Sequence, residues 1–132
     1  MSVYIDTSAF LAVLNADDRF HDRARARWQK LIEAEQPMFC NNYVLIETTA
    51  VLQNRIGMDA VIAFQIDVSP ILTILWIDEE LHLRAVSALL AARRRRLSLV
   101  DCASFESMRR VGLDQVFAFD GHFEEQGFEV LA

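Results

Sequence analysis

Short apolar runs alternate with longer amphipathic segments along the chain. The short runs are rich in β-branched and aromatic residues, which is typical of buried strands. Strands are therefore predicted at residues 3–5, 38–40, 72–77, 116–119 and 128–131. In the longer segments, apolar residues recur at the spacing of one helix face. This spacing predicts helices from Thr7 or Ser8 to Leu14, from Asp22 to Gln36, from Tyr43 to Ile56, from Asp59 to Asp67, from Asp78 into the Arg93–Arg96 run, and from Leu99 to Val111.

This alternation of strands and helices predicts an α/β protein with a central parallel sheet and helices on both faces. Polar residues just before three of the helices are good N-caps. Asp22 is expected to cap the second helix, Asn41 or Asn42 the third, and Ser98 the last. Trp28, Trp76 and the nine phenylalanines fall at helix or strand spacing, so most of them are expected in the core.

The composition excludes several classes of protein. With 53% hydrophobic and 24% charged residues, the chain has enough apolar surface to fold and is not disordered. Cys40 and Cys102 are not in a CxxC spacing, so we expect two buried thiols in a reducing compartment. The N-terminus lacks a basic region, and no apolar run has the length of a membrane span. A cytoplasmic protein without a membrane partner is expected.

The net charge of −6 limits how the protein can bind nucleic acid. Thirteen basic residues stand against nineteen acidic ones, and Lys30 is the only lysine. A protein whose whole surface binds nucleic acid is usually basic, so uniform binding along a phosphate backbone is not expected. A local basic patch stays open, and the acid surplus points to a metal site.

Four acidic residues stand out from those at ordinary helix starts and polar faces. They are Asp6 in YIDTSAF, Glu47 in YVLIETTAVL, Asp101 in LSLVDCASF and Asp120 in VFAFDGHF. The three aspartates also fit ordinary roles, as a helix cap, a first-turn acid and a turn residue. Glu47 lies among apolar neighbours on its helix, where an unpaired carboxylate is costly.

Taken together, the four acids predict a metal site. Asp6 and Asp120 follow predicted strands, and ligands of open parallel sheets bind beyond the carboxyl ends of the strands. Asp101 lies at a helix start, and Glu47 reaches the same edge from its helix. Carboxylates crowded together raise one another's pKa values, and a hard divalent cation with oxygen ligands removes that repulsion. Such a site cleaves phosphodiesters without a serine or histidine nucleophile.

These segments resemble the PIN-domain family of metal-dependent nucleases, and more closely its VapC-type bacterial toxins. The resemblance runs from YIDTSAF to FDGHFEEQGFEVL, with the four acids in the family's order. It implies a PIN-like three-layer α/β/α sandwich, a pocket for Mg²⁺ or Mn²⁺, and endonucleolytic hydrolysis of RNA by a metal-activated water. It also implies that residues 1–132 form a single nuclease domain, the toxin of a type II toxin–antitoxin pair.

The resemblance carries roles onto the four acids. Asp6 and Asp101 match the family's first and third acids and are expected to bind the cation. Glu47 matches the helix-borne glutamate, which binds the cation or orients the attacking water. Asp120 matches the fourth acid and is expected to act through a second cation or through water.

The resemblance also implies roles for Thr7 and Ser8, which follow the first acid, and it implies partners for the protein. Thr7 and Ser8 match hydroxyl residues, one of which helps to orient the site. A cognate antitoxin and a homodimer are implied. An exposed apolar face on the helix from Tyr43 or from Asp59 could serve either partner, while an ordinary core face is the first interpretation of any single apolar residue there.

The run Arg93, Arg94, Arg95 and Arg96 is the densest charge cluster in the sequence. Two interpretations stay open: a solvated helix end, or contacts to RNA phosphates, which arginine binds in a bidentate manner. The second gains weight because Arg96 shortly precedes Asp101. His122 is the only histidine near a candidate acid.

Two other functions compete with the nuclease. One is a catalytically silent PIN-like module that binds RNA or protein. The other is a Mg²⁺-dependent phosphatase or a phospho-receiver, but the chain lacks a DxDxT run and a late lysine. No nucleotide-binding glycine loop or GxSxG motif is present.

Overall fold

The computed structural model describes residues 1–132 and contains one sheet of five parallel strands. In chain order they are β1 (Val3–Ile5), β2 (Met38–Asn41), β3 (Thr73–Leu75), β4 (Gln115–Phe117) and β5 (Glu129–Leu131). Across the sheet the order is β3-β2-β1-β4-β5, and Tyr4 of the central strand pairs with Phe39 and Val116. Because every strand is parallel, all the carboxyl ends lie at one edge of the sheet.

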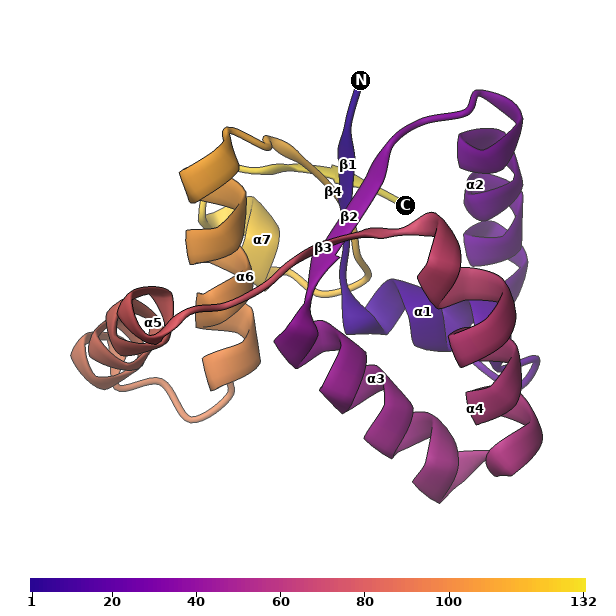
Figure 1. Cartoon of the computed structure of the whole chain (residues 1–132), viewed down its shortest axis with the longest axis horizontal. Helices are drawn as coiled ribbons and strands as arrows, with labels where there is room; N and C mark the ends of the chain where they lie inside the picture. The colour runs from indigo at the N-terminus through magenta and orange to yellow at the C-terminus, as the bar shows by residue number, and fades with distance from the viewer.

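Helices flank this sheet on both faces. They are α1 (Thr7–Leu14), α2 (His21–Glu33), α3 (Asn42–Arg55), α4 (Met58–Ala63), α5 (Glu79–Ala92), α6 (Leu99–Val111) and α7 (His122–Glu125). In Figure 1, α5, α6 and α7 lie on one side of the strands, α1, α2 and α4 lie on the other, and α3 extends below the ends of the strands. The predicted three-layer α/β/α sandwich with a central parallel sheet is confirmed.

Short polar side chains cap the starts of α1, α3, α5 and α6. Asn41, rather than Asn42, caps α3 by accepting a hydrogen bond from the Val44 amide at 2.8 Å. Ser98 caps α6 as predicted. The prediction for α2 is displaced, because Phe20 occupies the N-cap and Asp22 lies in the first turn, where an acid still suits the helix dipole.

Three elements of the structure differ clearly from the prediction. The segment from Asp59 begins as α4 but continues as a π-helix at Phe64–Val68 and a short 3₁₀ turn at Ser69–Ile71, where Pro70 has no amide to extend the helix. Helix α5 ends at Ala92, and Arg93 has a left-handed φ of 51°, so the arginine run forms a loop. The short helix α7 was not predicted.

The core lies between the sheet and its helices and contains 27 buried apolar residues. The hydroxyl of the fully buried Tyr4 donates to Ser104 Oγ at 2.8 Å, so its polar atom is satisfied. Cys40 and Cys102 are free and buried, as predicted. Trp76 contradicts its core assignment: it is 71% exposed, because it follows the edge strand β3. No helix combines the length and the hydrophobicity that crossing a bilayer requires.

Candidate active site

Asp6 lies at the carboxyl end of the central strand, where β1 passes into α1. It is only 4% exposed, and its amide donates to the Phe117 carbonyl at 3.0 Å. Its Oδ2 atom accepts hydrogen bonds from the Ser8 amide at 3.1 Å and from the Ser8 hydroxyl at 2.6 Å. Asp6 therefore caps α1, the ordinary role that the sequence allowed it, while its carboxylate stays at the sheet edge.

Asp101 comes to the same place from the first turn of α6. It forms a capping box with Ser98: the Asp101 amide donates to Ser98 Oγ, and the Ser98 amide donates to Asp101 Oδ2, each at 3.0 Å. This reciprocal pair fixes the carboxylate at the helix start. One oxygen of Asp101 is thus held by the backbone, and the side chain stays partly open to solvent.

Asp120 completes a cluster of three carboxylates. It lies in the loop after β4, and its Oδ1 atom accepts a hydrogen bond from the His122 amide at 3.0 Å. One oxygen each from Asp6, Asp101 and Asp120 lie within 4.8 Å of one another. Three carboxylate oxygens at this spacing are a donor set that fits a hard divalent cation such as Mg²⁺ or Mn²⁺.

Glu47 lies on α3 and faces the same hollow, but it is not part of the three-carboxylate cluster. Its neighbour Thr48 donates to the Thr7 hydroxyl oxygen at 3.1 Å, which leaves the Thr7 hydrogen free to face Glu47. Burial raises the pKa of Glu47, and the nearby charges of Asp101 and Asp120 act in the same direction, whereas Thr7 lowers it. The geometry therefore separates three close acids from a fourth that stands beside them.

Burial, and to a smaller extent the charges of neighbouring acids, raise the pKa values of Asp6, Glu47 and Asp120, which is the direction expected from the sequence. Burial is the main cause of the rise in the pKa of Asp6 to about 7, and the charges of Asp120 and Asp101 add to it. The two hydrogen bonds from Ser8 oppose this rise. Burial also raises the pKa of Asp120, with a further contribution from Asp101. Positive charge placed among these carboxylates would relieve both effects.

We will call the open depression around the acids the acidic hollow. Besides the four acids, its lining includes Thr7, Ser8, Arg55, Arg96, Ser98 and His122. The two arginines place positive charge at the rim of an otherwise acidic site. Arg55 was missed in the sequence, although Glu47, Val51 and Arg55 follow at intervals of four on one helix, a spacing that keeps them along one side.

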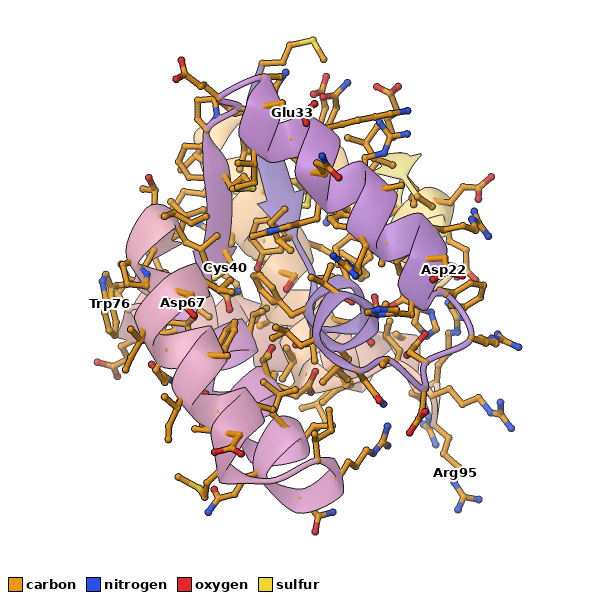
Figure 2. All side chains as sticks on the ribbon, turned by 90° about the vertical axis from the view of Figure 1, so that its right-hand side faces the viewer. Asp22, Glu33, Cys40, Asp67, Trp76 and Arg95 are labelled. Carbon is orange, nitrogen blue, oxygen red and sulfur yellow. The ribbon has the colours of Figure 1, made fainter.

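The four arginines of the run do not all face the acidic hollow. Only Arg96 lines it. Arg93, Arg94 and Arg95 line a separate groove beside the end of α5, and Arg94 donates to Glu125 at 2.7 Å. Figure 2 shows Arg95 projecting away from the body of the protein. The left-handed turn at Arg93 ends α5, so the arginine run lies in a loop. In this loop Arg96 faces the acidic hollow, and the other three arginines face the separate groove.

Comparison with known proteins decides the family. The PIN domain pattern matches residues 3–129, which is nearly the whole chain. The chain belongs to the PIN-domain family. This PIN domain is 34% identical over 129 residues to the 23S rRNA-specific endonuclease VapC20 of Mycobacterium tuberculosis, covering 96% of this chain and 95% of VapC20. The predicted relationship to VapC-type toxins is therefore confirmed.

Solved structures agree with this placement. The crystal structure of VapC20, described as a sarcin–ricin loop cleaving toxin, superposes with a TM-score of 0.84 at 33% identity, covering 96% of each chain. FitAcB from Neisseria gonorrhoeae is 14% identical with a TM-score of 0.71, over 98% of this PIN domain and 96% of that chain. The DNA-bound VapBC of Salmonella typhimurium is 16% identical with a TM-score of 0.67, over 99% and 97%. The last two show the fold alone.

A stability measurement tests the burial and crowding of the Asp6 carboxylate. Because the pKa of Asp6 rises to about 7, its ionisation removes stability as the pH rises from about 4 through about 7. Asp6→Asn keeps the helix cap but removes this charge. In EDTA at about pH 8, we expect the variant to be more stable than the parent by about 1–3 kcal/mol, which is several degrees in Tm.

Thermal unfolding across the pH range provides the control. The advantage of Asp6→Asn should shrink as the pH falls towards about 4, because Asp6 is then protonated in the parent as well. A parent that melts at a higher temperature than Asp6→Asn at alkaline pH in EDTA would contradict the conclusion that an ionised Asp6 destabilises the fold when no cation is bound.

Proposed function

We propose that this PIN domain is a divalent-metal-dependent endoribonuclease. The observation that carries the proposal is the cluster of Asp6, Asp101 and Asp120, whose oxygens lie within 4.8 Å at the carboxyl edge of a parallel sheet. A divalent cation held there, Mg²⁺ or Mn²⁺, would activate a water molecule and stabilise the charge that develops on the phosphate oxygens. The proposal treats residues 1–132 as one PIN-like nuclease domain.

Each of the four acids has its own role in the proposed reaction. Asp6 and Asp101 hold the cation, each with one oxygen already fixed by the backbone of a helix start. Asp120 adds a third charge, directly or through water. Glu47, with its raised pKa, orients the attacking water or completes the metal site.

The hydroxyl residues act on the acids rather than on the substrate. Ser8 holds Asp6 by two hydrogen bonds, and its Oγ atom also accepts a hydrogen bond from the Phe119 amide at 2.9 Å. Thr7 is buried between α1 and α3 and connects Glu47 to Thr48. These contacts keep the acids in place before any substrate arrives.

RNA is the proposed substrate because the relative with 34% identity is named for cleavage of 23S rRNA. We propose that Arg96 and Arg55 contact phosphates at the rim of the acidic hollow, where arginine forms bidentate contacts. Arg93, Arg94 and Arg95 would extend this contact along the neighbouring groove. A stem-loop RNA carrying the sarcin–ricin loop is the first substrate to test.

We propose further that the protein is the toxin of a type II pair, located in the cytoplasm, with a cognate antitoxin and a homodimer as its assemblies. Structural neighbours include a toxin–antitoxin complex from Klebsiella pneumoniae. On this chain, Ile46, Ile62 and Ile66 expose 66%, 49% and 66% of their surface on α3, α4 and the π-helix, which supports a protein partner there. Light scattering alone and with the antitoxin measures both assemblies.

Removal of the metal tests the reaction directly. With Mg²⁺ or Mn²⁺, the purified protein should cleave the stem-loop RNA, and EDTA should abolish cleavage, because the acids then have no cation to offset their charge. Adding back either ion in excess should restore the activity. Cleavage that continues unchanged in EDTA would refute the metal-dependent mechanism.

The same assay separates the two alternatives. A catalytically silent PIN-like module would bind the RNA but leave it intact with either ion. A Mg²⁺-dependent phosphatase would release inorganic phosphate from a terminal phosphate without cutting the chain. Gel analysis of the RNA and a phosphate assay on the same sample therefore distinguish all three functions.

A further inference from the structure

Two phenylalanine rings stack at the surface, next to the acidic hollow. The ring centroids of Phe20 and Phe119 are 4.7 Å apart, and their planes differ by only 10°. Both residues are partly exposed, whereas the rings of Phe10, Phe64 and Phe117 are buried in the core. Phe20 and Phe119 pack against the edge of the core and keep part of their surface open to solvent.

Two arginines cover the stacked rings. The guanidinium carbon of Arg19 lies 4.5 Å from the centre of the Phe20 ring, and that of Arg23 lies 5.6 Å from Phe20 and 5.8 Å from Phe119. Neither arginine forms one of the three ion pairs of the protein. Asp18, next to Arg19 in the sequence, accepts a hydrogen bond from the Phe20 amide at 2.8 Å.

The pair is connected to the catalytic acids through hydrogen bonds. The Phe119 amide donates to Ser8 Oγ at 2.9 Å, and the Ser8 hydroxyl donates to Asp6 at 2.6 Å. Phe119 also directly precedes Asp120. The loop that carries Phe20 leads into the first turn of α2, which contains Asp22. In Figure 2, Asp22 and Arg95 lie on the same side of the view.

We propose that Phe20 and Phe119, together with Arg19 and Arg23, form a stacking site for an unpaired nucleobase of the RNA beside the phosphodiester that is cut. Unpaired bases are recognised by stacking on aromatic rings and on guanidinium planes. Arg19 has a long, flexible side chain, so its guanidinium can move aside or continue the stack over the base. The unpaired positive charges suit the phosphates on either side. This inference rests on the proposed ribonuclease function.

The protein contains a matched control for the same chemistry. Phe105 and Phe128 are also stacked, with centroids 6.1 Å apart, and the Arg109 guanidinium lies 5.3 Å from Phe128. However, Phe128 immediately precedes β5 and so lies at the edge of the sheet opposite the acids. Arg109 is also engaged, because it donates to Gln126 at 2.7 Å.

Binding of RNA that lacks single bases tests the stacking site. The protein is the full chain carrying Asp6→Asn, which prevents cleavage during the measurement. The probe is the sarcin–ricin stem-loop, in which an abasic site is moved through the loop one nucleotide at a time. At one position, loss of the base should weaken binding by about tenfold. Phe20→Leu should remove this dependence on the base, and Phe128→Leu should leave it intact.

The outcomes distinguish this inference from the proposed function. A Phe20→Leu protein that discriminates against the abasic probe as strongly as its parent would overturn the stacking site, even if the wild type cleaves RNA. Conversely, a wild type that binds but never cuts would contradict the proposed function and leave the base dependence measurable. If Phe20→Leu unfolds, the exposed Arg19→Gln takes its place and should reduce the base-dependent part of the affinity. Unchanged base dependence in Arg19→Gln would then overturn the inference.

Steady-state kinetics of the cleaving enzyme give a second readout. In a chain that keeps Asp6, Phe20→Leu should raise KM for the stem-loop with little change in kcat for saturated RNA, because it removes binding rather than chemistry. A fall in kcat with an unchanged KM would place Phe20 in the positioning of Asp6 and Asp120 and would refute a base-binding role.

Discussion

Replacing Asp101 by asparagine is expected to reduce RNA cleavage by roughly 100-fold or more at saturating Mg²⁺. The substitution removes one of the three negative oxygens that lie within 4.8 Å and are proposed to hold the cation. It keeps an oxygen that accepts the hydrogen bond from the Ser98 amide, so the start of α6 stays in place. Cleavage rates at several Mg²⁺ concentrations measure the loss.

Glu106→Gln is the matched control for this substitution. Glu106 is another partly exposed acid on α6, but it lies outside the acidic hollow. It should change cleavage little, and both variants should keep the circular dichroism spectrum of the parent. If Asp101→Asn keeps full activity at limiting Mg²⁺, Asp101 is not part of the metal site.

The second large effect is expected from the arginines of the rim. Replacing Arg55 and Arg96 together by alanine should weaken RNA binding about tenfold at moderate salt and lower the salt dependence of the affinity by about one power for each arginine. Both side chains are exposed, so the fold should not change. Affinities measured over a range of salt concentrations, with a chain that also carries Asp6→Asn, give the slope.

Two comparison variants show where the phosphates lie. Arg84→Ala removes an exposed arginine that pairs with Glu80 at 3.1 Å, away from the acidic hollow, and should leave the slope unchanged. Arg95→Ala tests the neighbouring groove and should produce a smaller effect than the pair at the rim. If the Arg55 and Arg96 variant shows the same salt dependence of RNA affinity as the parent, these two arginines do not contact phosphates and are ordinary solvated surface residues.

Local signals in the sequence were sufficient for most of the fold. The β-branched runs and the N-caps at Asn41 and Ser98 mark their elements because each depends on neighbours along the chain. The order of the strands does not depend on such neighbours. It follows from which side each crossover packs on, and hydrophobic periodicity is the same for either edge. The π-helix after α4 was missed for a similar reason, since its pattern is that of an ordinary amphipathic helix.

The acids of the site were predictable for a physical reason that the arginines and aromatics lack. A carboxylate among apolar neighbours, such as Glu47, is unfavourable in any fold without a partner, so the sequence alone marks it. Arg55 and Phe20 are ordinary residues in their local contexts. Arg55 lies along the same side of α3 as Glu47, but this spacing alone does not single out an arginine as part of a site. Phe20 reaches Phe119, next to Asp120, only through the packing of the loop before α2, which no local pattern encodes.

Each clustered aspartate also has a structural role, since Asp6 caps α1, Asp101 closes the capping box of α6, and Asp120 holds the turn before α7. Asparagine accepts the same backbone hydrogen bonds. The codons for aspartate and asparagine differ only in their first base. At any of these three codons, a single transition therefore converts the gene into one whose product is expected to fold but has lost one charge of the proposed metal site. Under selection against the activity, folded and silent alleles are reached in one mutational step.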